Sequence, residues 1–179
     1  MIQPYRYVIA TGPEGSGTHM LADLVAELLG WPQSEPSLAQ IQHPEELTRG
    51  MVHHISLPSH RPPHWFLTPE KGPPKGSLVL GINRSPLDTL YSVWRRFGTR
   101  TPESVNEHGQ NLAHALIIME FWVSTIVDYE LLCSRKSEVD RLYEALRIKN
   151  PGKPPKLEMI NRNGKYRLDD FFMNEVGKS

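Results

Sequence analysis

The sequence predicts an α/β fold, a mainly parallel sheet of about four strands flanked by helices. Short apolar segments alternate along the chain with amphipathic segments of helical period, which is the pattern of parallel strands joined by helical crossovers. A glycine-rich turn follows the first strand. Of the 16 prolines, 11 lie between these segments, in residues 32–36, 58–74 and 151–155. Because proline fixes φ and removes a backbone donor, these clusters are predicted to be connectors.

The first half of the chain supplies three of the strands. Residues 5–10 are apolar or aromatic apart from Arg6 and predict a strand. Residues 19–29 carry apolar side chains at helical spacing and end at Gly30, a suitable helix C-cap. Residues 51–57 and 77–82 predict two further strands.

The second half supplies the remaining helices and one short strand. Residues 86–97 predict a helix, with Pro86 suited to its first turn. Residues 110–124 predict a long helix, and residues 125–129 a short strand or the continuation of that helix. Residues 137–146 predict an amphipathic helix.

Composition narrows the class of protein. A length of 179 residues favours a single domain spanning residues 1–179. Lys and Arg balance Asp and Glu at 20 each, which argues against binding nucleic acid by bulk electrostatics. The single cysteine, Cys133, excludes an internal disulfide framework. No apolar run approaches the roughly 20 residues of a membrane span, and no signal-peptide pattern opens the sequence, so a cytoplasmic location is expected.

The most informative segment is residues 10–21, which read ATGPEGSGTHML. A strand that runs into a glycine-rich turn and a helix forms an anion site, because backbone N–H groups converge at the helix N-terminus. Gly12 and Gly17 have the spacing of a Walker A loop. However, Thr18 stands where that loop has its lysine, and His19 where it has a serine or threonine. The first turn is therefore predicted to be P-loop-like, and the alternative is a tight turn without a ligand.

A second segment, residues 79–97, reads VLGINRSPLDTLYSVWRRF. Arg84 follows an apolar strand, and Ser92 lies about one helical turn beyond Asp88, on the same face. An arginine at the carboxyl edge of a sheet with a hydroxyl nearby suits a phosphate dianion. The alternative is a surface arginine beside an aspartate that favours the helix dipole.

Together the two segments resemble the sulfotransferases that use 3′-phosphoadenosine 5′-phosphosulfate (PAPS). In that family a loop with the motif P-[KR]-S-G-T-[TN] binds the 5′-phosphosulfate. A later segment with the motif R-x-P-x-D-x-x-x-S binds the 3′-phosphate. Residues 14–19 (EGSGTH) and 84–92 (RSPLDTLYS) match these motifs. The resemblance implies a P-loop NTPase-like sulfotransferase core. It also implies the cofactor ligands Gly15, Ser16, Gly17, Thr18, His19, Arg84 and Ser92.

Two shorter matches follow, and one position departs from the family. Residues 128–132 (DYELL) resemble the family's tyrosine-glutamate element. Residues 162–164 (RNG) resemble a late R-K-G stretch that closes over the 3′-phosphate, which implies Arg162 and Gly164 as further ligands. Gly15 replaces the basic residue of the loop, whose charge is expected to stabilise the sulfuryl group during transfer. His19 is a candidate to replace that charge in part.

Sulfuryl transfer to a hydroxyl or amine needs a general base, and histidine suits this task near neutral pH. Residues 53–60 (HHISLPSH) resemble the family's K-x-H-L-P element, with Ser56 in place of its histidine and His54 in place of its lysine. The candidate bases are His54 first and His60 second. Strand alternation predicts His54 and Ser56 on one face. The alternative is a histidine-rich loop exposed to solvent, and a metal site is not expected.

The expected cofactor is PAPS, or its product 3′-phosphoadenosine 5′-phosphate (PAP), and the expected acceptor is a hydroxyl or amine of a small molecule or glycan. No nucleic-acid partner and no metal are expected. Two alternatives remain: a non-catalytic nucleotide-binding module, to which Gly15 and Ser56 point, and a small nucleoside-phosphate kinase sharing the glycine loop. His108 is expected to flank a helix without a chemical role. The sequence leaves the acceptor and the oligomeric state open.

Overall fold

The computed structural model describes residues 4–34, 47–57, 73, 75–97, 102–134 and 136–149. Within them, four strands form one sheet: β1 (Tyr7–Pro13), β2 (Val52–Leu57), β3 (Ser77–Asn83) and β4 (Thr125–Asp128). Their order is β2-β1-β3-β4, and every neighbouring pair is parallel. The α/β prediction is therefore confirmed.

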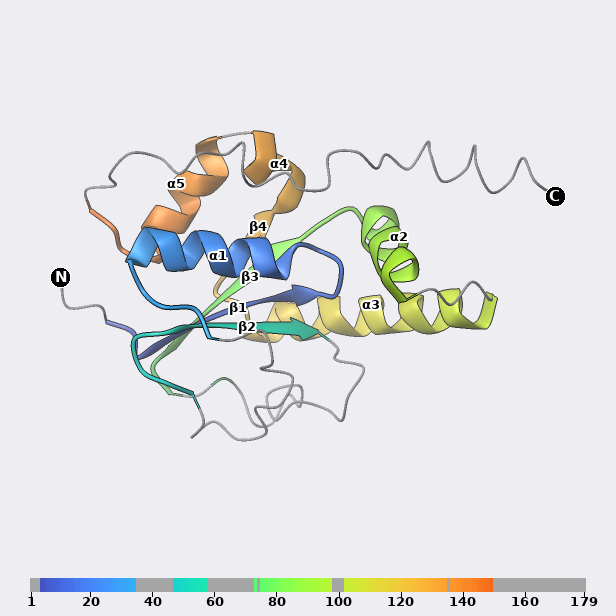
Figure 1. Ribbon diagram of the computed structural model, residues 1–179, viewed down its shortest axis with the longest axis horizontal. Helices are drawn as coiled ribbons and strands as arrows, with labels where there is room; N and C mark the ends of the chain where they lie inside the picture. Colours follow the sequence, from blue (N-terminus) through green and yellow to red (C-terminus); the bar gives the residue numbers. More distant parts are fainter. Residues whose placement is uncertain are drawn as a thin grey trace.

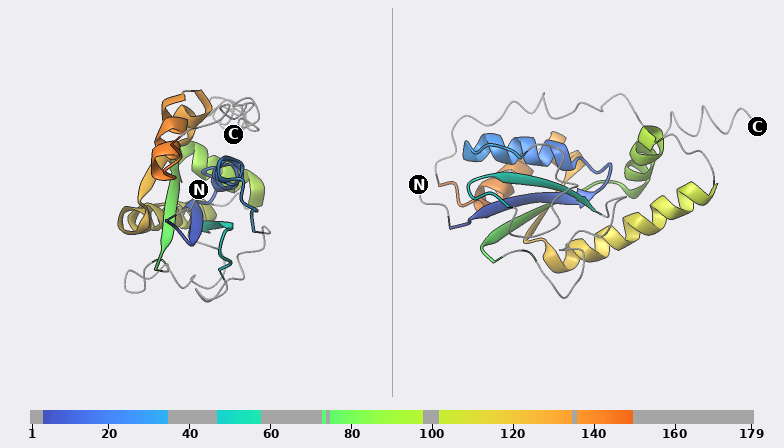
Figure 2. Two further views of the ribbon diagram at one scale, coloured as in Figure 1. Left: turned by 90° about the vertical axis from the view of Figure 1, so that its left-hand side faces the viewer. Right: turned by 60° about the horizontal axis from the view of Figure 1, so that its bottom comes forward.

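Helices cover both faces of this sheet (Figures 1 and 2). They are α1 (Thr18–Leu29), α2 (Pro86–Phe97), α3 (Pro102–Trp122), α4 (Tyr129–Ser134) and α5 (Lys136–Ala145). One face packs against α1, α4 and α5, and the opposite face packs against α3. The remaining helix, α2, stands beyond the carboxyl ends of the strands (Figure 1).

Alternation along β1 divides the core into two layers. Val8 and Ala10 pack toward α1, whereas Ile9 packs toward α3, and all three are fully buried. A parallel sheet covered on both faces needs apolar residues on both, which explains why its strands read as nearly continuous apolar runs. Burying each such large side chain contributes about 1.5–3 kcal/mol, so the sheet is a rigid support for whatever lies at its edge.

Three boundaries differ from the sequence prediction. Strand β1 continues to Pro13, because its pairing with β2 extends to the Pro13–Leu57 pair. Helix α3 begins at Pro102 rather than near residue 110, and Gly109 is tolerated inside it. Strand β4 ends at Asp128, whose Oδ1 accepts the backbone N–H of Leu131 at 2.8 Å and so starts α4.

In the parts of the chain that the structure describes, no helix combines the length and the apolar character that crossing a membrane requires.

Candidate functional site

The glycine loop between β1 and α1 leads directly into the first turn of α1. Gly15 and Gly17 have positive φ values of 83° and 103°, and Gly17 is the N-cap of α1 without a side-chain capping bond. The first intrahelical bond runs from the N–H of Leu21 to the carbonyl of Gly17, at 3.0 Å. The N–H groups of Thr18 and Met20 precede that bond and have no intrahelical acceptor. The start of a helix is a favourable place for an anion, and the anion site that the sequence predicts here stays a prediction.

Ser16 stabilises the turn of the loop from inside. Its side chain is fully buried, and its Oγ has no partner among the described residues. Its backbone N–H donates to the carbonyl of Pro13 at 3.0 Å, which closes the turn. Ser16 therefore shapes the loop from inside and does not present a side chain to a ligand.

Two distant segments pack so tightly against the loop that only glycine fits. A Cβ atom on Gly15 would lie 2.8 Å from the carbonyl oxygen of Thr89 and 3.2 Å from the Cβ of Ser92. A Cβ atom on Gly17 would lie 2.7 Å from the ring of Tyr129. Real Cβ atoms do not approach other atoms so closely, so both glycines are steric requirements. The contact also brings Ser92, a predicted ligand of the 3′-phosphate, next to the loop.

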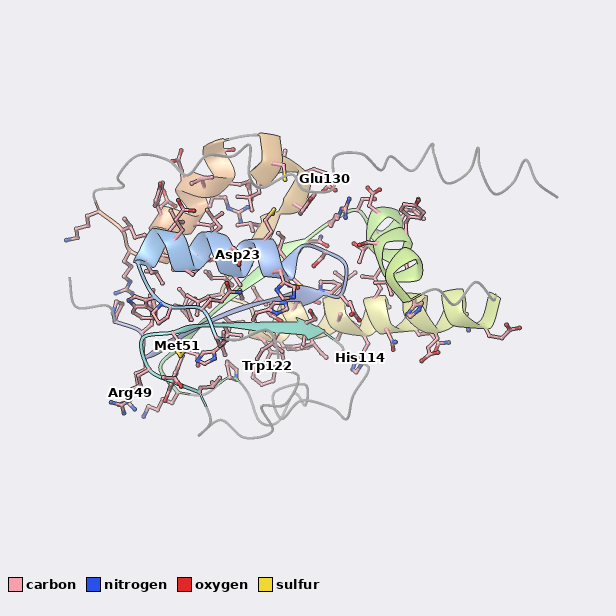
Figure 3. All side chains as sticks on the ribbon, in the orientation of Figure 1. Asp23, Arg49, Met51, His114, Trp122 and Glu130 are labelled. Carbon is pink, nitrogen blue, oxygen red and sulfur yellow. The ribbon has the colours of Figure 1, made fainter. Side chains whose placement is uncertain are left out.

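Arg84 lies at the same edge of the sheet and is held by three groups. Its side chain is only 10% exposed, so the interpretation as a surface arginine is wrong. One guanidinium nitrogen lies 3.5 Å from the carbonyl oxygen of Gly15, and Nε lies 3.4 Å from Glu130 Oε1. The guanidinium also stacks over the ring of Tyr129, 4.6 Å from its centroid. Figure 3 shows Glu130 at the start of α4, near the segment that leaves β3.

Tyr129 links the loop to Arg84 and stays neutral. Burial raises the pKa of its phenol, nearby Cys133 raises it further, and Arg84 opposes the shift. Burial also raises the pKa of the Cys133 thiol, which is therefore not activated. Tyr129 is not among the ligands that the sequence predicts, although it lies in residues 128–132, which resemble the tyrosine-glutamate element.

A second group of polar side chains joins β2 to the start of α1. The Nε2 of His54 lies 2.7 Å from Thr18 Oγ1 and 3.3 Å from Ser56 Oγ, and the two hydroxyls lie 3.2 Å apart. The ring of His19 stacks on that of His54, with centroids 3.8 Å apart. The predicted shared face of His54 and Ser56 is confirmed.

His53 points to the other face of β2, as alternation predicted. Its Nε2 donates to the carbonyl of Thr48 at 3.1 Å, and its ring lies 6.5 Å from that of Tyr7. Burial lowers the pKa of His53, opposed by the bond to Thr48, so a neutral, structural imidazole is favoured. His53 and His54 are 1% and 7% exposed, which shows that the interpretation as a solvent-exposed loop is wrong for both.

Replacing Thr18 with valine tests how much the Thr18–His54 contact stabilises the protein. Valine keeps the shape of threonine but leaves a buried imidazole nitrogen with one bond fewer, so the free energy of unfolding should fall by about 1–3 kcal/mol. Urea unfolding measures this change. The control is Thr125→Val on β4, and an equal loss in both variants would show that the contact contributes nothing.

The structure therefore brings most of the predicted site residues to one edge of the sheet. The glycine loop, Arg84, Ser92 and His54 all lie at the carboxyl ends of the strands. His60, Arg162 and Gly164 lie outside the described residues. Within the described ranges, no three His, Cys, Asp or Glu side chains are grouped so that they could hold a metal ion.

Comparison with known proteins adds little to this description. No family model and no curated protein matches the chain. Among solved structures it is similar to a sugar kinase from Janibacter sp. HTCC2649, with 18% identity, a TM-score of 0.48, and coverage of 82% of this chain and 96% of that one. It is also similar to a gluconokinase from Sinorhizobium meliloti 1021, with 20% identity, a TM-score of 0.44, and coverage of 82% and 92%.

Proposed function

We propose that the chain binds PAPS at the carboxyl edge of the sheet and transfers its sulfuryl group to a hydroxyl or amine of a small-molecule or glycan acceptor. The observation that carries the proposal is the contact between the two segments that the sequence predicts to bind anions. Arg84 and Gly15, 69 residues apart in the sequence, are in contact, and Ser92 packs against the same glycine. A ligand with two separate anionic groups on one nucleoside suits this arrangement.

Each anionic group has its own set of donors in this proposal. The N–H groups of Thr18 and Met20 in the first turn of α1 bind the 5′-phosphosulfate, where the helix dipole adds partial positive charge. The guanidinium of Arg84 and the hydroxyl of Ser92 bind the 3′-phosphate through charge-assisted hydrogen bonds. Arg162 and Gly164 remain further candidate ligands of that phosphate.

His54 and His19 take supporting roles. The Nε2 of His54 already contacts both Thr18 and Ser56, so this imidazole exchanges protons with a ligand through those hydroxyls rather than directly. His19 is exposed at the start of α1 and supplies positive charge near the phosphosulfate when protonated. This position matters because the packing around Gly15 leaves no room for the family's basic side chain. His60 remains a candidate base.

A small kinase is the second candidate, because Gly12 and Gly17 have Walker A spacing and the loop opens directly into α1. Phosphoryl transfer from ATP normally uses a lysine where Thr18 stands and a magnesium-binding hydroxyl where His19 stands. Here the Thr18 hydroxyl is engaged by His54 instead. The chain therefore lacks, at both positions, the side chains that ATP chemistry uses.

A labelled-donor assay tests the proposal. The protein is incubated with sulfur-labelled PAPS, or with γ-labelled ATP and Mg²⁺, and one panel of alcohols, amines and sugars. Metal-independent transfer of the label from PAPS is expected. Transfer from ATP that requires Mg²⁺ would replace the proposal with the kinase. Binding of PAP without any transfer would leave only the non-catalytic module.

Replacing Glu130 with glutamine should tighten the binding of PAP. Glu130 is the carboxylate on Arg84, and a bound phosphate competes with it for the guanidinium. Because Glu130 is 46% exposed, the pair is screened by solvent, and we expect a gain of about 2- to 10-fold in affinity by calorimetry. Glu120→Gln on α3 makes the same change of net charge away from the site. A loss of affinity in Glu130→Gln would show instead that the carboxylate orients Arg84.

A further inference from the structure

Helix α3 has a second apolar side, which faces away from the sheet. Its inward side is buried and consists of Leu112, Ala115, Ile118 and Met119. On the outward side Ile117 is 55% exposed and Phe121 is 69% exposed, and the two lie one helical turn apart. Figure 2 shows α3 as an outer layer of the molecule. A helix with apolar residues on both sides is usually covered on both sides.

This outward side carries no charge over most of its length. Between Glu107 and Glu120 the chain has twelve consecutive residues without Asp, Glu, Lys or Arg. The exposed residues of this stretch, together with Phe121, form what we call the α3 patch: Gln110, Ala113, His114, Ile117 and Phe121. Their spacing of three and four residues places them on one face of the helix. An exposed, uncharged face with large apolar side chains is typical of an interaction surface.

The α3 patch is complementary in shape to itself when two copies pack with their α3 helices antiparallel. A two-fold axis through Ile117 brings residues that lie equally far before and after it to the same level, because the helix rises evenly. Phe121 of one copy then faces a hole between four residues of the other copy: Gln110, Ala113, His114 and Ile117. The small side chain of Ala113 leaves room in this hole for the phenyl ring. Symmetry makes the contact twice.

The charges at the border of the α3 patch favour the same orientation. Glu120 lies in the last turn of α3, which holds no basic residue, so its carboxylate is unfavourably placed in its own helix dipole. In the antiparallel pair Glu120 comes to the level of His114 of the other copy, because each lies three residues from the axis. A parallel pair would instead bring the two Glu120 carboxylates to one level. A second copy of the chain therefore fits in both shape and charge.

We propose that the chain forms a homodimer through the α3 patch, with the two α3 helices antiparallel about Ile117. This inference goes beyond the proposed sulfuryl transfer and does not depend on it, because no residue of the α3 patch is a predicted ligand of the nucleotide. One pair of helices buries less area than a standard stable interface, so the dimer is expected to be weak and to form as the protein concentration rises.

Sedimentation equilibrium of the full chain tests the dimer. The average mass of the wild-type protein should rise from that of one chain toward that of two between about 1 µM and 1 mM. Phe121→Glu should lower the association constant by about 10-fold or more, because it places a charge in each hole. Leu87→Glu makes the same kind of change at a 51% exposed position of α2 and should leave association unchanged. A wild-type protein that stays monomeric, or equal weakening in both variants, would overturn the inference.

Cysteine cross-linking tests the position of the axis. In Ile117→Cys the two Cα atoms would lie about 4–6 Å apart, within reach of a disulfide, so mild oxidation should give a covalent dimer. Phe121→Cys is the control, because its two copies would lie about 12 Å apart along the helices. Both variants also carry Cys133→Ser, which removes the native thiol. Any pattern other than cross-linking of Ile117→Cys alone would overturn the antiparallel packing about Ile117.

Discussion

Replacing Arg84 with alanine is expected to lower the affinity for PAP by about 10- to 100-fold and to leave the affinity for adenosine 5′-phosphosulfate nearly unchanged. Hydrogen bonds to charged groups contribute about 1.5–3 kcal/mol, and each 1.4 kcal/mol is a factor of ten in affinity. The second ligand lacks the 3′-phosphate and therefore loses little. Calorimetric titration of both ligands into both proteins measures the difference.

Arg147→Ala is the matched control for this variant. Arg147 is also an arginine over a tyrosine ring, 5.9 Å from the centroid of Tyr5, but it follows α5, away from the glycine loop. Its removal takes away the same charge and a similar stacking contact, so it should not change the binding of either ligand. Equal weakening of both ligands in Arg84→Ala would show that Arg84 supports the loop and does not recognise a 3′-phosphate.

Replacing Gly15 with lysine, which restores the family's basic loop residue, is expected to destabilise the protein by about 2–5 kcal/mol and not to improve transfer. Two costs combine. A side chain at a φ of 83° is strained by about 1–2 kcal/mol. Its Cβ would also meet the Thr89 carbonyl at 2.8 Å and Val93 at 3.0 Å, and such overpacking costs about 1–3 kcal/mol.

Gly30→Lys separates the two costs. Gly30 has a φ of 64°, and a Cβ placed there would meet nothing within 4 Å, so this variant carries the backbone strain alone. Urea unfolding should show a clearly larger loss for Gly15→Lys than for Gly30→Lys. If the two variants were equally stable and Gly15→Lys transferred sulfuryl faster, the tight packing of α2 on the loop would not be the reason for glycine at this position.

Most of the fold could be predicted because its signals are local. The spacing of apolar residues predicted the strands and helices, and Gly30 predicted the end of α1. The structure confirms that end, because Gly30 has a positive φ and its N–H bonds to the carbonyls of Ala26 and Glu27. The boundaries that differed depend on partners far along the chain. Strand β1 extends to Pro13 only because β2 pairs with it there, and no local pattern reports that pairing.

The site could be predicted only where a motif carried it. The glycine loop, Arg84 and Ser92 were found from spacing, and the structure brings them together. Tyr129 reaches the loop because β4 lies beside β3, which the sequence order of the strands does not dictate. Such contacts follow from sheet order and helix packing rather than from periodicity.

The most direct test of the central claim is calorimetric titration of the wild-type protein with PAP, adenosine 5′-phosphosulfate and ATP with Mg²⁺. The account predicts that PAP binds most tightly, because it alone of the three carries a 3′-phosphate for Arg84 and Ser92. Tighter binding of ATP, or equal binding of all three ligands, would contradict the assignment of this edge of the sheet to a 3′-phosphorylated nucleotide.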